Sequence, residues 1–253
     1  MKDSQDYLDK KTFFDSIITL YGRNVVLEIL EDETLTIHKI HLAKSNRDEG
    51  PIEKIREIAQ KRSIEIKMHT KEQLSRISKN AKQDQGVAID IVAPNYKKAQ
   101  NLEASLGTSF RLLALDGVQN PQNLGMIVRS AAAGNIDGII LPDKNAAKIS
   151  PLVIKASAGT LFKIPIFYCN RLEDALNTLQ ESTEIYALSS HAKEDIYSVK
   201  TGERVIFVLG NESEGVSSEV NKYCNRSLSI PMQRGVESLN VAVTAALLAF
   251  LPA

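Results

Sequence analysis

An arginine that stands alone in an otherwise apolar helix is the first residue of this sequence that could do chemistry. Residues 120–135 read NPQNLGMIVRSAAAGN, where Asn120 can cap a helix and apolar residues recur at helical spacing. Arg129 lies among small apolar residues, with no carboxylate three or four positions away. A guanidinium in this setting is typical of a phosphate site, and equally of a surface arginine whose stem covers the core. Asn123, at the start of the same helix, is the second candidate of this segment.

A polar loop directly after a strand is the second candidate site. Residues 208–215, VLGNESEG, end a run that looks like a buried strand, and Gly210 stands at its end. A glycine at a strand end allows a ligand to approach the backbone closely, and Glu212 beyond it can orient a hydroxyl or a neighbouring polar group. The plainer interpretation is a polar loop in which Glu212 or Glu214 caps the next helix.

The C-terminal segment places polar residues at the start of a nearly all-apolar helix. Residues 230–251 read IPMQRGVESLNVAVTAALLAFL, and Ser238 is a plausible N-cap. We expect this helix to be deeply buried, because it is apolar on every side. Asn240 then lies inside the first turn, where burial of an unpaired amide would cost on the order of 1–3 kcal/mol. The pattern therefore predicts that Asn240 bonds to another part of the chain or to a ligand.

Several common catalytic patterns are absent from the sequence. It has no GxxxxGK(S/T) P-loop, no GxGxxG after a strand and no GxSxG nucleophile elbow. His38 and His41 belong to an alternating stretch and should face opposite sides of a strand, so we expect no metal site there. Cys169 and Cys224 lack CxxC spacing, which favours buried thiols in a reducing cytoplasm over a disulfide framework or a zinc site.

The charge of the chain is balanced overall but uneven along its length. The 253 residues are 43% hydrophobic and 25% charged, which is typical of a globular protein, and the formal net charge is zero. Residues 61–82 nevertheless hold seven Lys/Arg against two Glu. This segment, the basic strip, is either a patch that contacts phosphates or a solvated surface. The sequence has no run of roughly 18 apolar residues, and its N-terminus lacks the apolar stretch of a signal peptide.

The elements that must hold these residues divide the chain in two. Residues 16–93 alternate short β-like and helical stretches, which indicates a small α/β domain, preceded by a polar tail over 1–15. Residues 94–111 are polar and predict a linker. Residues 112–253 repeat strand and helix, which predicts an α/β fold with a parallel sheet covered on both faces. Ligands of such sheets bind outside the carboxyl ends of the strands, where the polar motifs lie.

Together these motifs resemble the SpoU/TrmH family of RNA 2′-O-ribose methyltransferases, within the SPOUT superfamily. The matching stretches are NPQNLGMIVRSAAAG, LGNESEG and IPMQRGVESLNVAV, in that order and at family-like spacing. The resemblance implies a trefoil knot in the C-terminal domain, a rare exception to the rule against threaded chains. It implies an L30e-like N-terminal domain that grips structured RNA, as in the ribosomal-RNA branch of the family. It also implies S-adenosylmethionine as cofactor, a homodimer with a shared site, and a guanosine of large-subunit ribosomal RNA as substrate.

The resemblance assigns roles to ten residues. It implies that five hold the cofactor largely through backbone groups: Leu209, Gly210, Ile230, Met232 and Leu239. It implies that Arg129 acts on the target ribose and its phosphate, reaching across the dimer. Because free arginine is essentially always protonated, we assign it to stabilise the developing alkoxide, with an RNA phosphate as a candidate proton acceptor. Four residues would orient Arg129 and the nucleotide: Asn123, Glu212, Ser238 and Asn240. No metal is needed, because the cofactor already carries an activated methyl group.

Two positions depart from the pattern of the family. Asp84 stands where relatives commonly have histidine, so the resemblance assigns no role to this aspartate. Gly235 is three residues after Met232, whereas relatives usually place a glycine two residues after that methionine. The spacing from Met232 to Ser238 is unchanged, so we expect a local loop difference and an active enzyme.

Other functions are open at this point. The chain could modify transfer RNA, or it could be a non-catalytic RNA-binding protein that retains the knot, and a cofactor-binding assay would separate catalytic from non-catalytic readings. A nucleotide-dependent oxidoreductase on an ordinary doubly wound sheet lacks the glycine fingerprint that such enzymes use.

Overall fold

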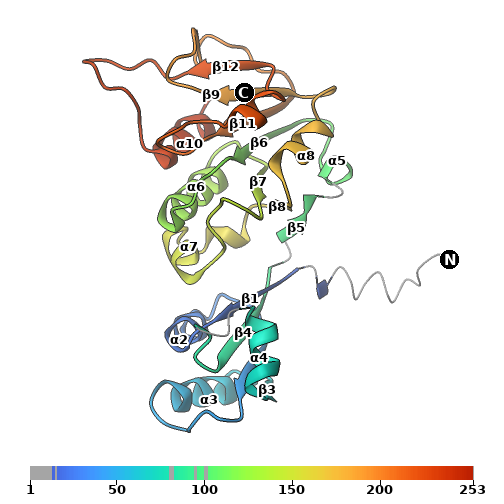
Figure 1. Ribbon diagram of the computed structural model, residues 1–253, viewed down its shortest axis with the longest axis vertical. Helices are drawn as coiled ribbons and strands as arrows, with labels where there is room; N and C mark the ends of the chain where they lie inside the picture. The colour runs from blue at the N-terminus through green and yellow to red at the C-terminus, as the bar shows by residue number, and fades with distance from the viewer. Residues whose placement is uncertain (1–12, 15, 80–82, 94–95, 100–101, 253) are drawn as a thin grey trace, which may run out of the picture. The chain divides into compact units, whose positions relative to one another are not determined.

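The computed structural model describes residues 13–14, 16–79, 83–93, 96–99 and 102–252, in two compact units that divide after Pro94 (Figure 1). Most of the expected N-terminal tail, residues 1–15, therefore lies outside the described residues. None of the helices in the described part of the chain has the length and hydropathy of a transmembrane span.

The N-terminal unit is built on a mixed four-stranded sheet in the order β1-β4-β2-β3. The strands β2 and β3 run parallel, and the other neighbouring pairs are antiparallel. Its elements are β1 (Ile17–Tyr21), α2 (Arg23–Glu31), β2 (Ile37–Ala43), α3 (Pro51–Lys61), β3 (Ile66–His69), α4 (Lys71–Ser78) and β4 (Val87–Val92).

Alternation along the strands gives this sheet two different faces. Ile40 and Leu42 of β2 are fully buried, as an apolar face requires, while the alternate residue Ala43 packs with Leu74 of α4. Thr70 caps the start of α4, because its side chain accepts a hydrogen bond from the backbone of Gln73 in a capping box. The α/β character predicted for this half is thus observed.

The C-terminal unit is an eight-stranded, wholly parallel sheet in the order β10-β12-β9-β11-β6-β7-β8-β5. Part of the segment interpreted as a linker forms its edge strand β5, which pairs with β8. The strands are β5 (Tyr96–Lys98), β6 (Phe110–Leu115), β7 (Gly138–Pro142), β8 (Ile166–Cys169), β9 (Glu184–Leu188), β10 (Glu194–Asp195), β11 (Arg204–Leu209) and β12 (Arg226–Ser229). The helices are α5 (Leu102–Ser105), α6 (Pro121–Ala133), α7 (Pro151–Ala156), the 3-10 helix η2 (Thr160–Phe162), α8 (Leu172–Asn177), α9 (Ser218–Asn221) and α10 (Val241–Ala249).

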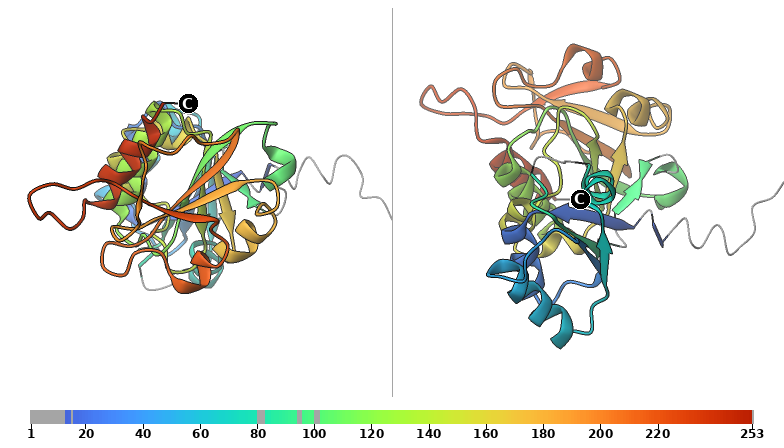
Figure 2. Two further views of the ribbon diagram at one scale, coloured as in Figure 1. Left: turned by 90° about the horizontal axis from the view of Figure 1, so that it is seen from above. Right: turned by 60° about the horizontal axis from the view of Figure 1, so that its bottom comes forward.

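Helices cover both faces of this sheet, as the sequence predicts. Figure 2 shows the green α6 and red α10 on one side and the orange-yellow α8 on the other. Alternate strand residues such as Leu112, Ala114 and Ile206 pack with Leu176 of α8 in one core cluster. A sheet buried on both faces needs strands that are largely apolar, and all six residues of β6 are buried. The one charged residue among them, Arg111, donates hydrogen bonds to the carbonyl of Leu251 at 2.9 Å and to the hydroxyl of Thr201 at 3.1 Å.

Two glycines let the other helices approach α6 closely. A Cβ atom at Gly125 would lie 2.4 Å from the Cβ of Ala156, at the end of α7. A Cβ atom at Gly134, which follows α6, would lie 2.3 Å from the carbonyl oxygen of Ala249 in α10. Asn120 caps the other end of α6 by accepting hydrogen bonds from the backbone of Gln122 and Asn123. The position of α6 is therefore tightly constrained.

The chain order in the sheet reverses at its centre. From β6 the chain runs outward to β7 and β8, whereas β9, β11 and β12 lie on the other side. After β12 the chain returns and ends in α10, which packs against α6. A knot requires this returning segment to pass through an earlier loop, and the threading stays a prediction of the resemblance.

Candidate functional site

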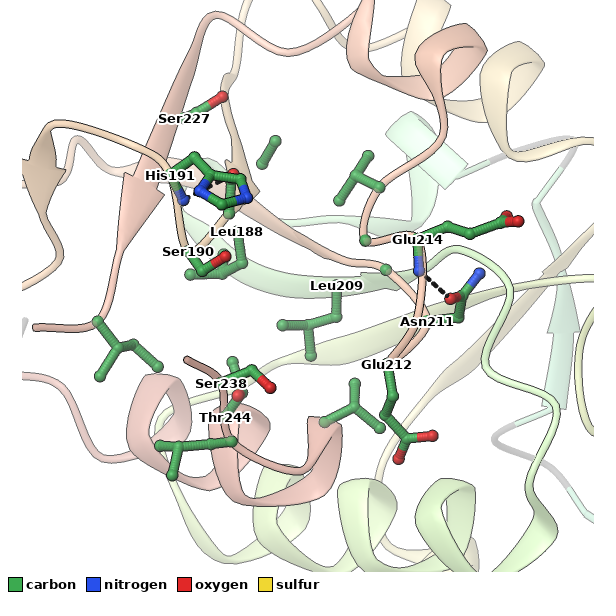
Figure 3. Close-up of a pocket in the computed structure, with 18 of the residues that line it drawn as sticks. Leu188, Ser190, His191, Leu209, Asn211, Glu212, Glu214, Ser227, Ser238 and Thr244 are labelled. Atoms are coloured by element: carbon green, nitrogen blue, oxygen red, sulfur yellow. Dashed lines mark hydrogen bonds between the residues drawn. The ribbon is translucent and has the colours of Figure 1, made fainter. Parts of the chain in front are cut away.

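A cavity of about 370 Å³ lies where β9, β11 and β12 end, outside the carboxyl edge of the parallel sheet (Figure 3). This is the edge at which ligands of such sheets bind, and the volume is that of a small-molecule site. Three loops and the start of α10 form its walls, with lining residues drawn from 187–191, 209–216, 227–232, 238–239 and 241–244. The lining includes all five residues that the resemblance assigns to the cofactor: Leu209, Gly210, Ile230, Met232 and Leu239.

The loop after β11 folds back tightly upon itself. The side chain of Asn211 accepts hydrogen bonds from the backbone of Ser213 at 2.9 Å and of Glu214 at 2.7 Å, and the backbone of Gly215 donates to the carbonyl of Asn211 at 3.1 Å. A Cβ atom at Gly210 would lie 1.9 Å from the carbonyl carbon of Gly215. Glycine is thus required at position 210 by the fold of the loop itself, a reason that sequence reasoning did not identify.

Glu212 joins the three sequence motifs at one edge of the cavity. Its Oε1 atom accepts hydrogen bonds from the side-chain amides of Asn123, at 2.5 Å, and Asn240, at 3.1 Å. The amide of Asn240 also donates to the Oδ1 atom of Asn123 at 3.2 Å. These residues come from α6, the loop after β11 and the start of α10. Asn240 therefore has the partners in the chain that the sequence analysis predicts for it.

The capping of α10 differs from the expectation. Asn240 is itself the N-cap, because its Oδ1 atom accepts a hydrogen bond from the backbone of Ala242 at 2.9 Å. It is exposed and stands before the first turn, so the expected burial inside the helix is wrong. Ser238, the plausible cap in the sequence, lies two residues earlier and is an exposed residue of the cavity wall. Both types favour N-caps, and tertiary contacts with Glu212 select the asparagine.

Arg129 lies apart from the cavity. It is exposed on α6, does not line the cavity, and makes no hydrogen bond or ion pair with any described residue. Asn123, on the same helix, points instead toward Glu212. In a single copy of the chain the guanidinium is therefore separate from the other predicted residues.

The helix α10 is not buried all round, contrary to expectation. Ala245, Leu248 and Ala249 are fully buried, but Val243 is 43% exposed and Phe250, at its C-cap, is 62% exposed. On the neighbouring α6, Met126 is 47% exposed. A helix that is apolar on every side yet partly exposed carries an unpartnered apolar face.

The cavity has polar residues that sequence reasoning missed. Ser190 and His191 follow β9, and Figure 3 shows them across the cavity from Glu212 and Ser238. The stretch SSH directly follows the apolar run EIYAL, so the rule that places ligands after parallel strands could have found it. The other polar residues of the lining that were missed are Ser189, Asn211, Ser213, Glu214, Asn221, Ser227 and Thr244.

The charge of the cavity is acidic. Glu212 and Glu214 are in the lining, whereas no lysine or arginine is among the lining residues that the structure describes. Apolar walls from Leu209 and Leu239 complete a site whose chemistry suits a ligand with a flat apolar part and a positive charge.

The remaining nucleophiles are not set up for catalysis. Burial raises the pKa of Cys169 to about 12 and that of Cys224 to about 11, so both thiols are protonated near neutral pH. His41 is buried and bonded to Asp90 at 2.9 Å, and its Nδ1 atom lies 2.9 Å from the Nε2 atom of His69. No cluster of three or more potential metal ligands occurs among the described residues.

Only some of the cations in the basic strip, residues 61–82, are exposed and available for phosphate contacts. Arg62 is turned inward and donates to the backbone carbonyls of Leu30, Asp32 and Leu35. Lys82 lies outside the described residues. The exposed cations of the strip are Lys61, Lys67, Lys71, Arg76 and Lys79.

Asp84, the first departure from the family pattern, closes a buried turn. Its side chain accepts hydrogen bonds from the hydroxyl of Ser78 and the backbone of Gly86, each at 3.0 Å. Only 3% of the residue is exposed, so the structure gives this aspartate a role in holding the turn before β4.

Family profiles match both units of the chain. The profile of the SpoU rRNA methylase family matches residues 111–250. A second profile, described as RNA 2′-O ribose methyltransferase substrate binding, matches residues 19–97.

Relatives and solved structures are similar over nearly the whole chain. A 23S rRNA (guanosine-2′-O-)-methyltransferase RlmB of Xylella fastidiosa is 30% identical over 91% of this chain and 94% of that protein. An uncharacterized tRNA/rRNA methyltransferase of Mycolicibacterium vanbaalenii is also 30% identical, over 93% of this chain and 75% of that protein. The crystal structure of the SpoU methyltransferase AviRb from Streptomyces viridochromogenes, in complex with AdoMet, has a TM-score of 0.61 at 18% identity and covers 98% of this chain and 91% of that one.

Proposed function

Because the chain belongs to the SpoU rRNA methylase family, we propose that it transfers a methyl group from S-adenosylmethionine to the ribose 2′-hydroxyl of a guanosine in 23S ribosomal RNA. The enzyme class, an RNA 2′-O-ribose methyltransferase, follows from the family. The guanosine and the ribosomal substrate rest on the name of the relatives called RlmB, and action on transfer RNA is the alternative that other relatives suggest. A cytoplasmic location, expected from the cysteines, is part of the same proposal.

What carries the proposal is the meeting of the three motifs at one edge of a cofactor-sized cavity, where Glu212 accepts hydrogen bonds from Asn123 and Asn240. The cavity suits S-adenosylmethionine, because apolar walls can enclose adenine and the two glutamates favour a positively charged sulfonium. Leu209, Gly210, Ile230, Met232 and Leu239 would hold the cofactor. When bound, the cofactor supplies a methyl group that its positive sulfur makes ready for transfer.

The residues of the chain have two tasks in this reaction. The first is to place the ribose oxygen, because positioning alone can supply up to roughly 7–11 kcal/mol of barrier reduction in favourable systems. Glu212 fixes the amides of Asn123 and Asn240, and with Ser238 these groups form a polar edge that orients the nucleotide. The second task is to stabilise the negative charge that grows on the 2′-oxygen as its proton leaves.

Arg129 performs the second task from the partner subunit. Its guanidinium stays protonated, so it stabilises the alkoxide and the adjoining phosphate, and an RNA phosphate is the candidate acceptor of the proton. Arg129 is exposed on α6 beside the apolar face of Met126, Val243 and Phe250. A second copy of the chain packed on this face buries the apolar residues of both copies. Arg129 of each copy then lies toward the cavity of the other copy. The homodimer therefore completes a site that a single copy lacks.

The N-terminal unit holds the RNA. Its family profile is that of a substrate-binding domain, and the exposed cations of the basic strip are suited to phosphate contacts. If the unit binds RNA through its phosphates, its affinity for RNA decreases as salt is added.

A labelled-methyl assay tests the proposal. The purified protein is incubated with S-adenosylmethionine carrying a tritiated methyl group and with 23S ribosomal RNA or transfer RNA made in vitro, and the modified nucleotide is then mapped. We expect label in 23S ribosomal RNA as a 2′-O-methylguanosine. Label confined to transfer RNA selects the alternative, and tight cofactor binding with no label in either RNA contradicts the choice of substrate.

A further inference from the structure

The segment between β12 and α10 has both ends in the cavity and an exposed tip. Met232 and Ser238 line the cavity, whereas residues 233–237 are exposed. Figure 2 shows this segment projecting away from the sheet and the helices of its unit. A side chain at the tip is therefore linked to the cavity by a few residues on each side and faces solvent.

The tip is a tight turn that places an arginine in an unfavourable backbone conformation. The backbone of Val236 donates to the carbonyl of Gln233 at 3.2 Å, and the two residues between them have φ angles of +59° at Arg234 and +74° at Gly235. Two consecutive left-handed residues are typical of a type I′ turn, where glycine and asparagine are favoured. Gly235 suits this conformation, and Arg234 does not. Strained residues of this kind persist where the surrounding structure or function requires them.

The charge of the cavity gives a reason for an arginine at this tip. A ribose within an RNA chain has a phosphate on each side, yet the charged residues Glu212 and Glu214 of the lining would repel phosphates. Cations that offset this repulsion must come from outside the lining. Arg234 is exposed and has no hydrogen bond or ion pair with any described residue, so its guanidinium is free to bind an anion.

We infer that Arg234 is a substrate-contact residue, which binds a phosphate of the RNA next to the target ribose from the tip of the 230–239 loop. The inference rests on the proposed function, since it takes RNA as the substrate of this cavity. It also explains the shifted glycine. Position 234, two residues after Met232, has a backbone conformation that favours glycine, and here an arginine that contacts the RNA occupies it. The arginine at position 234 then lowers the stability of the turn and strengthens the binding of RNA.

Because stability and RNA affinity should change in opposite directions, the variant Arg234→Gly tests the inference. Glycine removes the strain and the charge together, so we expect the Tm to rise by roughly 2–4 °C. We expect the Kd for 23S ribosomal RNA, measured by filter binding, to rise roughly tenfold, and the slope of log Kd against log salt to fall by about one. The Kd for S-adenosylmethionine, measured by calorimetry, should remain that of the wild type.

Two further variants and a control separate charge from loop structure. Arg234→Asn suits the turn but is neutral, so it should resemble Arg234→Gly, whereas Arg234→Lys should retain most RNA affinity without the gain in Tm. Glu237→Gln removes a neighbouring exposed charge and should leave RNA affinity equal to or above that of the wild type. Wild-type RNA affinity and salt slope in Arg234→Gly overturn the inference, as does a joint loss of Tm and cofactor affinity, which would mark a structural role. A wild-type protein that binds RNA through Arg234 but methylates none of it would contradict the proposed function and leave the contact standing.

Discussion

At the scale of single residues, the proposed chemistry depends on Arg129 and Glu212, whose surroundings in the structure differ. Arg129 has no partner among the described residues, and Glu212 has two amide partners. The first is free to act on a substrate, whereas the second holds other residues in place. We therefore expect substitution of Arg129 to affect methyl transfer directly and substitution of Glu212 to affect the position of its partners. The substitution of Arg129 is the sharper test.

Arg129→Ala should lower the kcat of methyl transfer at least about a hundredfold, the usual effect of removing a group that stabilises a developing oxyanion. Its affinity for S-adenosylmethionine should be unchanged, because Arg129 does not line the cavity. Rapid-quench methylation assays and calorimetry measure the two quantities. Arg171→Ala, which removes another exposed arginine, is the matched control and should retain full activity. Near wild-type turnover in Arg129→Ala would remove this residue from the mechanism.

Gly210→Ala should disrupt the loop after β11, since the added methyl group would lie 1.9 Å from the carbonyl carbon of Gly215. We expect the variant to lose measurable binding of S-adenosylmethionine while its circular dichroism remains that of a folded protein. Gly107→Ala is the control, because the nearest atom to its added Cβ is 3.4 Å away. Normal cofactor affinity in Gly210→Ala would show that the loop can shift without affecting the cavity.

At the scale of elements, the strands of the N-terminal unit carry a buried polar row. Thr19 of β1 donates to Asp90 of β4 at 2.7 Å, and His41 of β2 joins Asp90 to His69 of β3. Burial raises the pKa of Asp90, but the hydrogen bonds from His41 and Thr19 outweigh it and hold the pKa below its usual value. The carboxylate only accepts, so His41 donates from Nε2, and in its neutral form it accepts from His69 at Nδ1.

This row predicts a pH dependence of stability. Burial and the neighbouring His41, Lys67 and Lys39 lower the pKa of His69 from its usual 6.5. As the pH falls below 6.5 the unfolded chain gains a proton that the folded chain does not, so the free energy of unfolding decreases until the pH passes the folded pKa. His69→Gln keeps a donor for His41 but does not titrate.

We expect thermal melts of His69→Gln to show a smaller loss of Tm between neutral pH and the acid side of 6.5 than those of the wild type. The exposed His191 serves as the matched position, and His191→Gln should leave the pH dependence unchanged. Equal slopes for the wild type and His69→Gln would contradict the assignment of the proton uptake to His69.

The exposed cations of the basic strip are the second group of residues to be tested together. Reversal of three exposed charges, Lys67→Glu, Lys71→Glu and Arg76→Glu, should weaken binding to 23S ribosomal RNA and reduce its salt dependence, because phosphate contacts release fewer counterions. Filter binding across a salt series measures both effects. Reversal of Lys163 and Lys222, exposed residues of the other unit that do not line the cavity, provides the comparison. Unchanged RNA affinity would make the strip a solvated surface only.

At the scale of the whole molecule, the proposed dimer decides whether the site is complete. Phe250→Asp places a charge in the exposed apolar face of α6 and α10, so it should yield a monomer in sedimentation velocity and abolish methyl transfer. Tyr197→Asp, at another exposed aromatic residue, should remain dimeric.

Mixed dimers test the sharing of the site directly. A dimer of one Arg129→Ala chain and one Gly210→Ala chain has one intact cavity, served by the arginine of the other chain, so it should recover about half of wild-type activity. Affinity tags on the two chains allow this species to be purified. An inactive mixed dimer would place Arg129 in its own chain's site.

Much of this protein could be predicted from local sequence patterns, because local chemistry determines those features. Asn120 and Pro121 place the start of α6, and continuous apolar runs predict parallel strands buried on both faces. The polar motifs after the strands could be expected at the ligand-binding edge, and the five residues that the family resemblance assigns to the cofactor line the cavity there. The family could be identified from three motifs, because their order along the chain is itself a pattern.

Tertiary structure alone decided which of several equally suitable residues took each role. Ser238 and Asn240 are both good N-caps, and the contact with Glu212 selects Asn240. Arg62 and Lys67 are both cations of the strip, but only Arg62 turns inward, where it donates to three backbone carbonyls at and beyond the C-terminal end of α2. The exposed face of α10 could not be foreseen from its apolar sequence, because such a helix is buried either by its own chain or by a second copy. The sequence determines which groups are available, whereas long-range packing determines their neighbours, and the neighbours set their burial, charge and hydrogen bonds.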